Sequence, residues 1–212
     1  MASATRGAAA TLSSRLRNWQ GIPFLRAATH ATANVVGWTS IFVFLLDRVG
    51  SLASVEGRSM QPTLNPDESR LQRDLLLLDK YSATKRKWRR GDVVTLRTPL
   101  DANHVAAKRI IALEDDWVVP DPRSKFVQRN GLRSGQSLRI PKGHCWVEGD
   151  AGLHSRDSQE YGPVPLALLT ARVAAVVWPP ARIGWVETDP MCPRSRTSVV
   201  TREAIRSGSS IL

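Results

Sequence analysis

Cysteine and histidine are scarce in this chain. Its 212 residues include two cysteines and four histidines, and these do not stand at the spacing of a metal-binding motif. Two cysteines are also too few for the disulfide framework of a small secreted domain. The sequence therefore predicts no metal site and no cofactor.

Acidic residues are absent from the first 46 positions, where Arg6, Arg15, Arg17 and Arg26 lie among alanine, serine and threonine. An acid-free start that carries arginine and serine is typical of a transit segment directed to an organelle. The alternative is a flexible basic terminus without an address. The composition of this segment is compatible with targeting to a chloroplast as well as to a mitochondrion. We treat residues 1–26 as a basic N-terminal segment.

A long, purely apolar run is lacking as well. Residues 27–46 carry no charge, but they reach the roughly 20 residues that span a bilayer only if polar residues such as His30 are counted. A cleaved secretory signal fits poorly, because Asp47 and Arg48 follow at once. We predict a transmembrane anchor over residues 27–48, with a buried core helix as the alternative. The arginines before it predict an N-terminus on the more negative side of the membrane.

The net charge of +11 says little about the fold. Part of the charge comes from a basic cluster around Trp88, between Lys80 and Arg90. Such a cluster is compatible with nucleic acid, with anionic lipid headgroups or with a solvated loop. We favour the solvated loop and predict no nucleic-acid partner.

Short runs rich in β-branched residues, separated by turn formers, predict a mainly β domain over residues 51–187. The expected strands are 75–78, 93–96, 105–113, 144–148 and 171–178, with a hairpin turn at Asn130-Gly131. His144 and Cys145 are neighbours on one strand and face opposite ways, so a Cys–His catalytic pair is not expected. Residues 188–212, rich in serine and arginine, are predicted to be a flexible C-terminal tail.

One serine stands on a stretch of chain that its neighbours bend. Gly57 allows a sharp bend just before Ser59, and two prolines, Pro62 and Pro66, exclude a regular helix. A serine on a rigid turn presents its hydroxyl in a set direction, but it needs a base to become a nucleophile. Taken alone, Ser59 would be one more polar turn residue.

Lys108 is a candidate for that base. It lies among apolar neighbours in the run Val105–Leu113, where desolvation would favour the neutral amine and lower its pKa. A neutral amine near pH 7 accepts a hydroxyl proton. On a strand, Lys108 and Arg109 point to opposite faces, so one of them can be buried while the other is exposed.

Four stretches resemble, in order and spacing, the conserved boxes of the type I signal peptidases, which are membrane-bound serine proteases with a Ser–Lys dyad. The stretches are Val55–Pro66, Gly91–Leu96, Lys108–Asp116 and Gly149–Ser158. The resemblance runs from about residue 35 to about residue 187. In the detailed sequence of shorter stretches, including Lys142–Asp150 and Trp178–Gly184, the chain is similar to the subunit 2 family of mitochondrial inner membrane peptidases.

This resemblance implies a signal-peptidase-like antiparallel β domain with one N-terminal transmembrane helix. It selects Ser59 as the nucleophile and Lys108 as the buried base. Ser155 would orient the Lys108 amine. The other supporting positions would be Gly149, Asp150, Asp157 and Ser158. Met60 and Pro62 would help to bind a substrate with small residues before the cut.

Two positions depart from the family pattern. Gly57 stands where bacterial members usually carry a serine whose hydroxyl completes the oxyanion hole. Gln159 stands where an arginine usually follows the Asp–Ser pair. The second oxyanion donor is therefore unassigned, and a salt bridge to Asp157 is either missing or supplied by another group.

By resemblance, the reaction is the removal of targeting or sorting signals from precursor proteins delivered to the mitochondrial intermembrane space. The expected partners are those precursors, a homologous subunit 1 in a heterodimer, and inner-membrane lipid, with the catalytic domain facing the intermembrane space. The alternatives are a catalytically impaired subunit that stabilises its partner, and a thylakoid or bacterial-type signal peptidase. A Ser–Lys self-cleaving repressor would need a helix-turn-helix segment, and residues 1–50 offer an apolar stretch instead.

Overall fold

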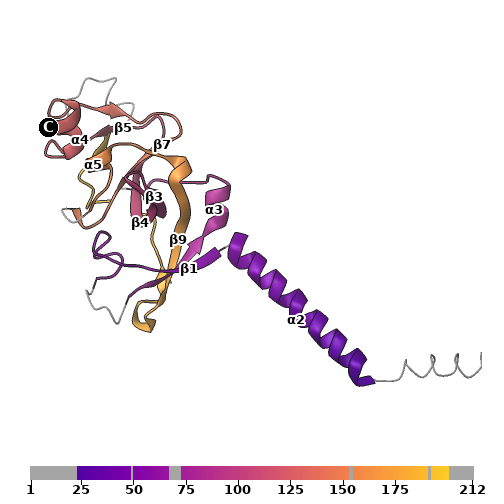
Figure 1. The fold of residues 1–212 in the computed structure, drawn as a ribbon. Coiled ribbons are helices and arrows are strands. Elements are labelled where there is room, and N and C mark those ends of the chain that lie inside the picture. Colours follow the sequence, from indigo (N-terminus) through magenta and orange to yellow (C-terminus); the bar gives the residue numbers. More distant parts are fainter. Residues whose placement is uncertain (1–22, 49, 67–72, 153–154, 191, 201–212) are drawn as a thin grey trace, which may run out of the picture. The chain divides into compact units, whose positions relative to one another are not determined.

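The computed structural model describes residues 23–48, 50–66, 73–152, 155–190 and 192–200 (Figure 1). By its internal contacts the chain divides into two units, Met1–Leu46 and Asp47–Leu212. Most of the predicted basic segment, residues 1–22, lies outside the described residues.

The described part of the first unit is helical. Helix α2 (Pro23–Arg48) is 26 residues long and exposes large apolar side chains, among them Trp38, Phe42 and Phe44. The Ser40 hydroxyl donates to the Val36 carbonyl one turn back, so this polar side chain is satisfied within the helix. Among the described residues, no helix is both long and apolar enough to cross a membrane. The transmembrane anchor expected at 27–48 therefore stays a prediction.

The second unit is mainly antiparallel β-sheet, as the β-branched runs predicted. Its strands are β1 (Gly50–Ser54), β2 (Leu75–Asp79), β3 (Val93–Thr98), β4 (Asp101–Ala112), β5 (Trp117–Val119), β6 (Leu138–Arg139), β7 (His144–Glu148), β8 (Val164–Pro165), β9 (Leu169–Trp178), β10 (Gly184–Trp185) and β11 (Ser198–Val200). Within the described ranges, the larger sheet has the order β1-β2-β9-β3-β4-β7-β8, and β10 pairs with β9. A smaller sheet has the order β11-β5-β6.

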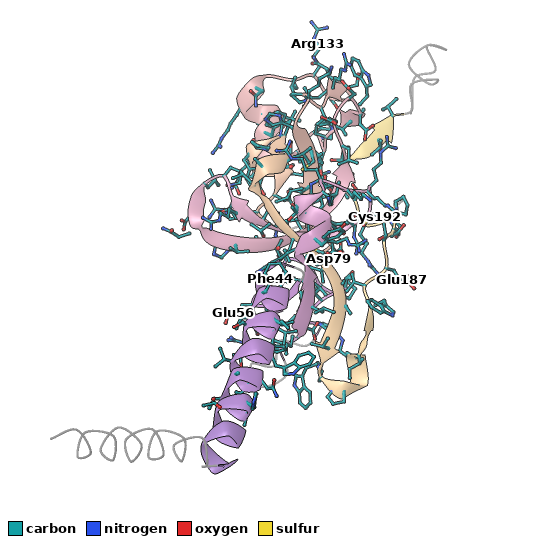
Figure 2. All side chains as sticks on the ribbon, turned by 90° about the vertical axis from the view of Figure 1, so that its right-hand side faces the viewer. Phe44, Glu56, Asp79, Arg133, Glu187 and Cys192 are labelled. Atoms are coloured by element: carbon teal, nitrogen blue, oxygen red, sulfur yellow. The ribbon has the colours of Figure 1, made fainter. Side chains whose placement is uncertain are left out.

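Short helices join the strands. They are α3 (Lys80–Thr84), α4 (Lys125–Asn130), α5 (Ser158–Tyr161), η2 (Leu166–Leu168) and η3 (Pro180–Arg182). The hairpin predicted at Asn130-Gly131 is wrong, because Gly131 ends α4 in the left-handed conformation, with φ of 62°. Arg133, just after this helix, lies at the outer end of the domain (Figure 2).

The core fixes the strands that carry the candidate residues. Met60 and Leu64, from the bent stretch after β1, pack in one cluster with Leu76 of β2 and Val93 of β3. β3 and β4 pair so that Val94 lies opposite Lys108. The bent stretch and β4 are therefore held by the same packed layer.

The end of the chain differs from the prediction. Residues 198–200 form β11, which pairs with β5, and Val199 packs against the apolar cluster around Trp146. A flexible tail from residue 188 onward is therefore wrong for this part, because strand pairing and apolar contact hold it. Residues 201–212 lie outside the described residues.

Candidate functional site

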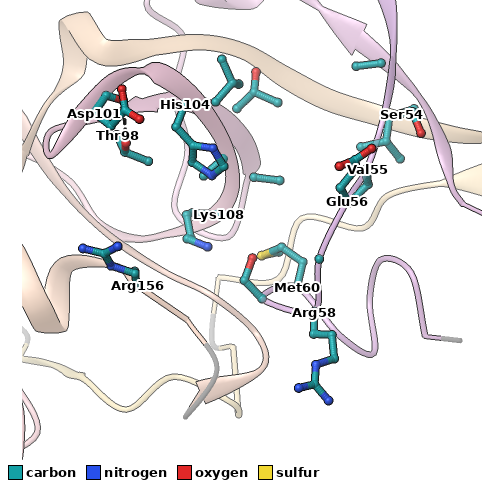
Figure 3. Close-up of a pocket in the computed structure, with 18 of the residues that line it drawn as sticks. Ser54, Val55, Glu56, Arg58, Met60, Thr98, Asp101, His104, Lys108 and Arg156 are labelled. Carbon is teal, nitrogen blue, oxygen red and sulfur yellow. Dashed lines mark hydrogen bonds between the residues drawn. The ribbon is translucent and has the colours of Figure 1, made fainter. Parts of the chain in front are cut away.

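A groove with a volume of about 950 Å³ lies between the bent stretch after β1 and strand β4. Its lining includes both Ser59 and Lys108, together with Met60, His104 and Tyr161. Figure 3 shows Lys108 and Met60 facing one another across the groove, with Glu56 on one wall and Asp101 on another. The structure thus brings the predicted nucleophile and the predicted base to one cavity.

The backbone at Ser59 is tied to the loop that follows β7. The Ser59 carbonyl accepts a hydrogen bond of 3.1 Å from the Ala151 N–H. Gly149 packs so closely here that a Cβ at this position would overlap the Ser59 carbonyl oxygen and the Ser155 hydroxyl. The predicted supporting residue Gly149 is therefore a contact point between two of the resembling stretches, and the absence of a side chain allows it.

Farther along the bent stretch, charged side chains hold the turn. The Arg182 guanidinium donates to both Asp74 carboxylate oxygens at 2.6 Å and to the Thr63 carbonyl at 3.1 Å. Asp74, which is fully buried, also accepts the Asn65 N–H at 2.7 Å. These bonds fix the direction in which the stretch leaves Ser59.

Lys108 is almost completely buried, with 2% of its surface exposed. Burial lowers the pKa of its ammonium from the ordinary value of 10.5 to about 8, because the charged form loses its hydration. The negative charges of Asp157 and Asp150 oppose this effect, and the positive charge of Arg196 adds to it. A substantial neutral fraction near pH 8 makes Lys108 able to act as a base.

Arg109 is buried as well, with 4% of its surface exposed. Its guanidinium donates two hydrogen bonds to the Asp150 carboxylate, at 3.0 and 2.7 Å, and one of 2.8 Å to the Gly91 carbonyl. Thr63 donates its hydroxyl to the same carboxylate. The expected split of one buried and one exposed side chain is wrong, because Asp150 and the backbone satisfy this second cation. Asp150 thus links β4 to the Ser59 stretch.

The Asp157-Ser158 pair braces the loop after β7. Asp157 accepts the Gly149 N–H at 3.0 Å and the Gln159 N–H at 3.1 Å, and the Ser158 hydroxyl accepts the Val147 N–H at 2.9 Å. Burial raises the pKa of the Asp157 carboxyl, and its hydrogen-bond partners and Arg196 counteract that rise. Ser155 lies beside Asp157, but its buried hydroxyl has no hydrogen-bond partner among the described residues. The expected hydrogen bond from Ser155 to the Lys108 amine is therefore not formed in this structure.

The two predicted substrate-binding residues differ in position. Met60 is 2% exposed, packs in the core and lines the groove. Pro62 follows two residues later and does not belong to the lining. Cys145, which was not expected to be catalytic, is buried in another cluster, and burial raises the pKa of its thiol to about 12.

Sequence reasoning missed several residues of the site. Tyr161 lines the groove, and its buried hydroxyl has no hydrogen-bond partner among the described residues. Glu148 and Arg196 do not line the groove, but Arg196 pairs with Asp157 at 2.7 Å. Glu148 ends β7, Tyr161 ends α5 and Arg196 precedes β11. Single polar residues at such places are common, so these residues carried no signal of their own. In the part of the chain that the structure describes, no group of three or more His, Cys, Asp or Glu side chains could hold a metal ion.

The sequence is similar to known proteins over most of its length. The family model "Signal peptidase, peptidase S26" matches residues 28–123. Mitochondrial inner membrane protease subunit 2 of Schizosaccharomyces pombe is 36% identical, with 78% of this chain and 88% of that protein covered. The mouse protein of the same name is 39% identical, with 77% and 86% covered.

Two other similarities concern a different subunit and a solved structure. Mitochondrial inner membrane protease subunit 1 of Schizosaccharomyces pombe is 40% identical, over 58% of this chain and 70% of that protein. A crystal structure of a signal peptidase I from Enterococcus faecalis is 20% identical, with a TM-score of 0.32, and covers 42% of this chain and 97% of that one. At 36 to 39% identity over most of both chains, this chain belongs to the mitochondrial inner membrane protease subunit 2 family of S26 signal peptidases.

Proposed function

We propose that this protein is a serine endopeptidase of the mitochondrial inner membrane in which Ser59 is the nucleophile and Lys108 is the base. The observation that carries the proposal is a nearly buried lysine, with a pKa of about 8, in the same groove as Ser59. Membership of an S26 peptidase family supports the reaction class.

The proposed mechanism uses the protein's own side chains. The neutral Lys108 amine removes the Ser59 hydroxyl proton as the oxygen attacks the scissile carbonyl carbon. The protonated amine then gives this proton to the leaving amine, and an acyl-enzyme ester remains on Ser59. Water, deprotonated by the same amine, hydrolyses the ester and restores the free serine. Because Lys108 is desolvated, it is neutral at a pH at which an exposed lysine would be charged.

The substrate would lie extended along the groove, with a small residue before the cut against Met60. The Ser59 backbone N–H is the proposed first oxyanion donor. Gly57 offers no side-chain hydroxyl for a second donor. The ring of Tyr161 lines the groove, but its hydroxyl is buried and is not assigned a contact with the peptide.

The finer setting is also part of the proposal. Helix α2 would anchor the chain in the inner membrane in a single pass, since its described apolar side chains are exposed and its Ser40 hydroxyl bonds its own backbone. The catalytic domain would face the intermembrane space and remove sorting signals from precursors delivered there. A homologous subunit 1 would be the partner in a heterodimer, since subunit 1 proteins are related in sequence to this chain.

Processing of a precursor by four variants tests the dyad. S59A and K108A should both abolish cleavage in the full-length protein in detergent, whereas S51A on β1 and K142A on an exposed turn should cleave as the unsubstituted protein does. Circular dichroism and thermal unfolding check that each variant is folded. Cleavage at an undiminished rate by folded S59A would end the proposal.

A second candidate function is a catalytically impaired subunit that stabilises subunit 1. Gly57 favours it, because it leaves the oxyanion hole with one donor fewer than the bacterial arrangement. In that case S59A would still support cleavage by the partner, and loss of this whole chain would lower the amount of the partner.

A further inference from the structure

Gln159 directly follows the Asp157-Ser158 pair and contacts residues from two other parts of the chain. Its side-chain amide donates to the Glu148 carboxylate at 2.7 Å and to the Thr197 hydroxyl at 2.7 Å. Gln159 is buried, with 4% of its surface exposed. Its side chain therefore joins the end of β7 to a segment near the end of the chain.

The C-terminal segment Ser195–Thr197 is docked on Glu148. One carboxylate oxygen accepts the Arg196 N–H at 2.8 Å and the Ser195 hydroxyl at 3.0 Å, and the other accepts the Thr197 hydroxyl. The Trp146 indole N–H donates to the carboxylate as well, at 3.0 Å. A carboxylate that is 2% exposed and has this many donors is a strong, directional attachment point.

Docking on Glu148 directs the Arg196 side chain to Asp157. Its Nη2 atom lies 2.7 Å from the Asp157 Oδ2 atom, and the Asp157 side chain is fully buried. The same carboxylate oxygen accepts the Gly149 N–H. Arg196 therefore neutralises the carboxylate that holds Gly149 against the Ser59 carbonyl.

We propose that Arg196 is a positioning residue for the peptidase reaction: the C-terminal segment supplies, from across the fold, the cation that pairs with Asp157 beside Lys108. This inference rests on the proposed Ser59–Lys108 function. It assigns to the docked segment Ser195–Thr197 a role in the site and not in stability alone.

The charges around Lys108 predict how Arg196 acts. Asp157 and Asp150 raise the pKa of the Lys108 amine, and Arg196 lowers it. The other ionisable groups that line the groove are Glu56, Arg58, Asp101, His104, Arg156 and Tyr161. Removal of the Arg196 charge leaves Asp157 unopposed, so protonated Lys108 becomes more stable and less neutral amine is present at pH 7.

The test measures kcat/KM against pH for the full-length protein in detergent, with a precursor peptide as substrate. R196Q keeps most of the side-chain length and removes the charge, and R196K keeps the charge. R194Q makes the same change at the exposed arginine just before this segment. We expect the acid limb of R196Q to move to higher pH by about half a unit, equal to about a threefold lower kcat/KM at pH 7. R196K and R194Q should keep the position of the unsubstituted protein.

If kcat/KM of R196Q falls on the acid side at the same pH as that of the unsubstituted protein, the inference is overturned, whatever the thermal stability of R196Q. If R196Q does not fold, D157N and D157N/R196Q give the same comparison, because neither variant leaves the Asp157 carboxylate buried without a cation. The acid limb of D157N/R196Q must then lie at a higher pH than that of D157N. S59A separates the two proposals: an active S59A ends the proposed function, whereas an inactive S59A with an unmoved R196Q limb ends this inference alone.

Discussion

Replacement of Lys108 by methionine should make the protein more stable and inactive at the same time. Methionine has a similar length and no charge, so it fills the same buried space without the loss of hydration that a buried ammonium suffers. A Lys108 pKa of about 8, against 10.5 for an exposed lysine, corresponds to about 3 kcal/mol of free energy at pH 7. We expect K108M to raise the free energy of unfolding by about this amount.

The pH dependence gives a sharper form of the same prediction. Between pH 8 and 10.5 the unfolded chain binds more protons at this position than the folded chain, so this lysine makes stability rise with pH in that window. Below pH 8 both states are protonated and the destabilisation is complete. The advantage of K108M should therefore shrink from about 3 kcal/mol at pH 7 to about 2 kcal/mol at pH 9. Cys145 titrates similarly in both proteins, so its contribution cancels in the difference.

Urea unfolding of the full-length protein in detergent, followed by tryptophan fluorescence, measures both quantities. K142M makes the same change at an exposed lysine and should leave the free energy of unfolding unchanged. Equal stability of K108M and the unsubstituted protein at pH 7, or a difference that does not change between pH 7 and pH 9, would refute the idea of a desolvated amine.

Three further outcomes are expected. The value of kcat/KM should rise with pH through a limb near 8, because the base must lose its proton, and a limb near 6.5 in a peptide assay would instead indicate a histidine. G149A should lose activity and solubility, because a Cβ there overlaps the Ser59 carbonyl oxygen, whereas G184A, with nothing within 4 Å, should behave normally in expression and cleavage assays. R109M should lower the free energy of unfolding by about 3–5 kcal/mol, because it leaves the buried Asp150 carboxylate without its cation, and a loss below about 1 kcal/mol in urea unfolding would contradict that pairing.

The elements closest to the proposed chemistry could be predicted from the sequence for local reasons. Gly57 and Pro62 mark the bend around Ser59, and the apolar neighbours of Lys108 indicate its burial before any tertiary contact is known. β2, β3, β4 and β9 coincide with runs rich in β-branched residues or leucine, so the main sheet could be predicted in outline.

The contacts behind the groove could not be predicted, because each depends on residues far apart in the chain. Asp157 and Arg196 are 39 residues apart, and nothing in the local sequence distinguishes Arg196, which has a buried partner, from the exposed Arg194. Strand alternation places Lys108 and Arg109 on opposite faces, so with Lys108 buried Arg109 was expected to be exposed. The local sequence does not show that Asp150, 41 residues later, pairs with Arg109 and allows its burial. Asn-Gly occurs both in hairpin turns and at helix ends. Here the preceding residues form helix α4, so Gly131 ends a helix.

The docking of Ser195–Thr197 on Glu148 has a consequence for the order in which the molecule is completed. A polypeptide that is still being synthesised contains Ser59, Lys108 and Asp157 well before the ribosome adds Arg196. Until Arg196 is added, the Asp157 carboxylate lacks the cation that pairs with it in the complete fold. Proteolytic removal of residues from 195 onward would remove the same cation from Asp157 in the mature protein.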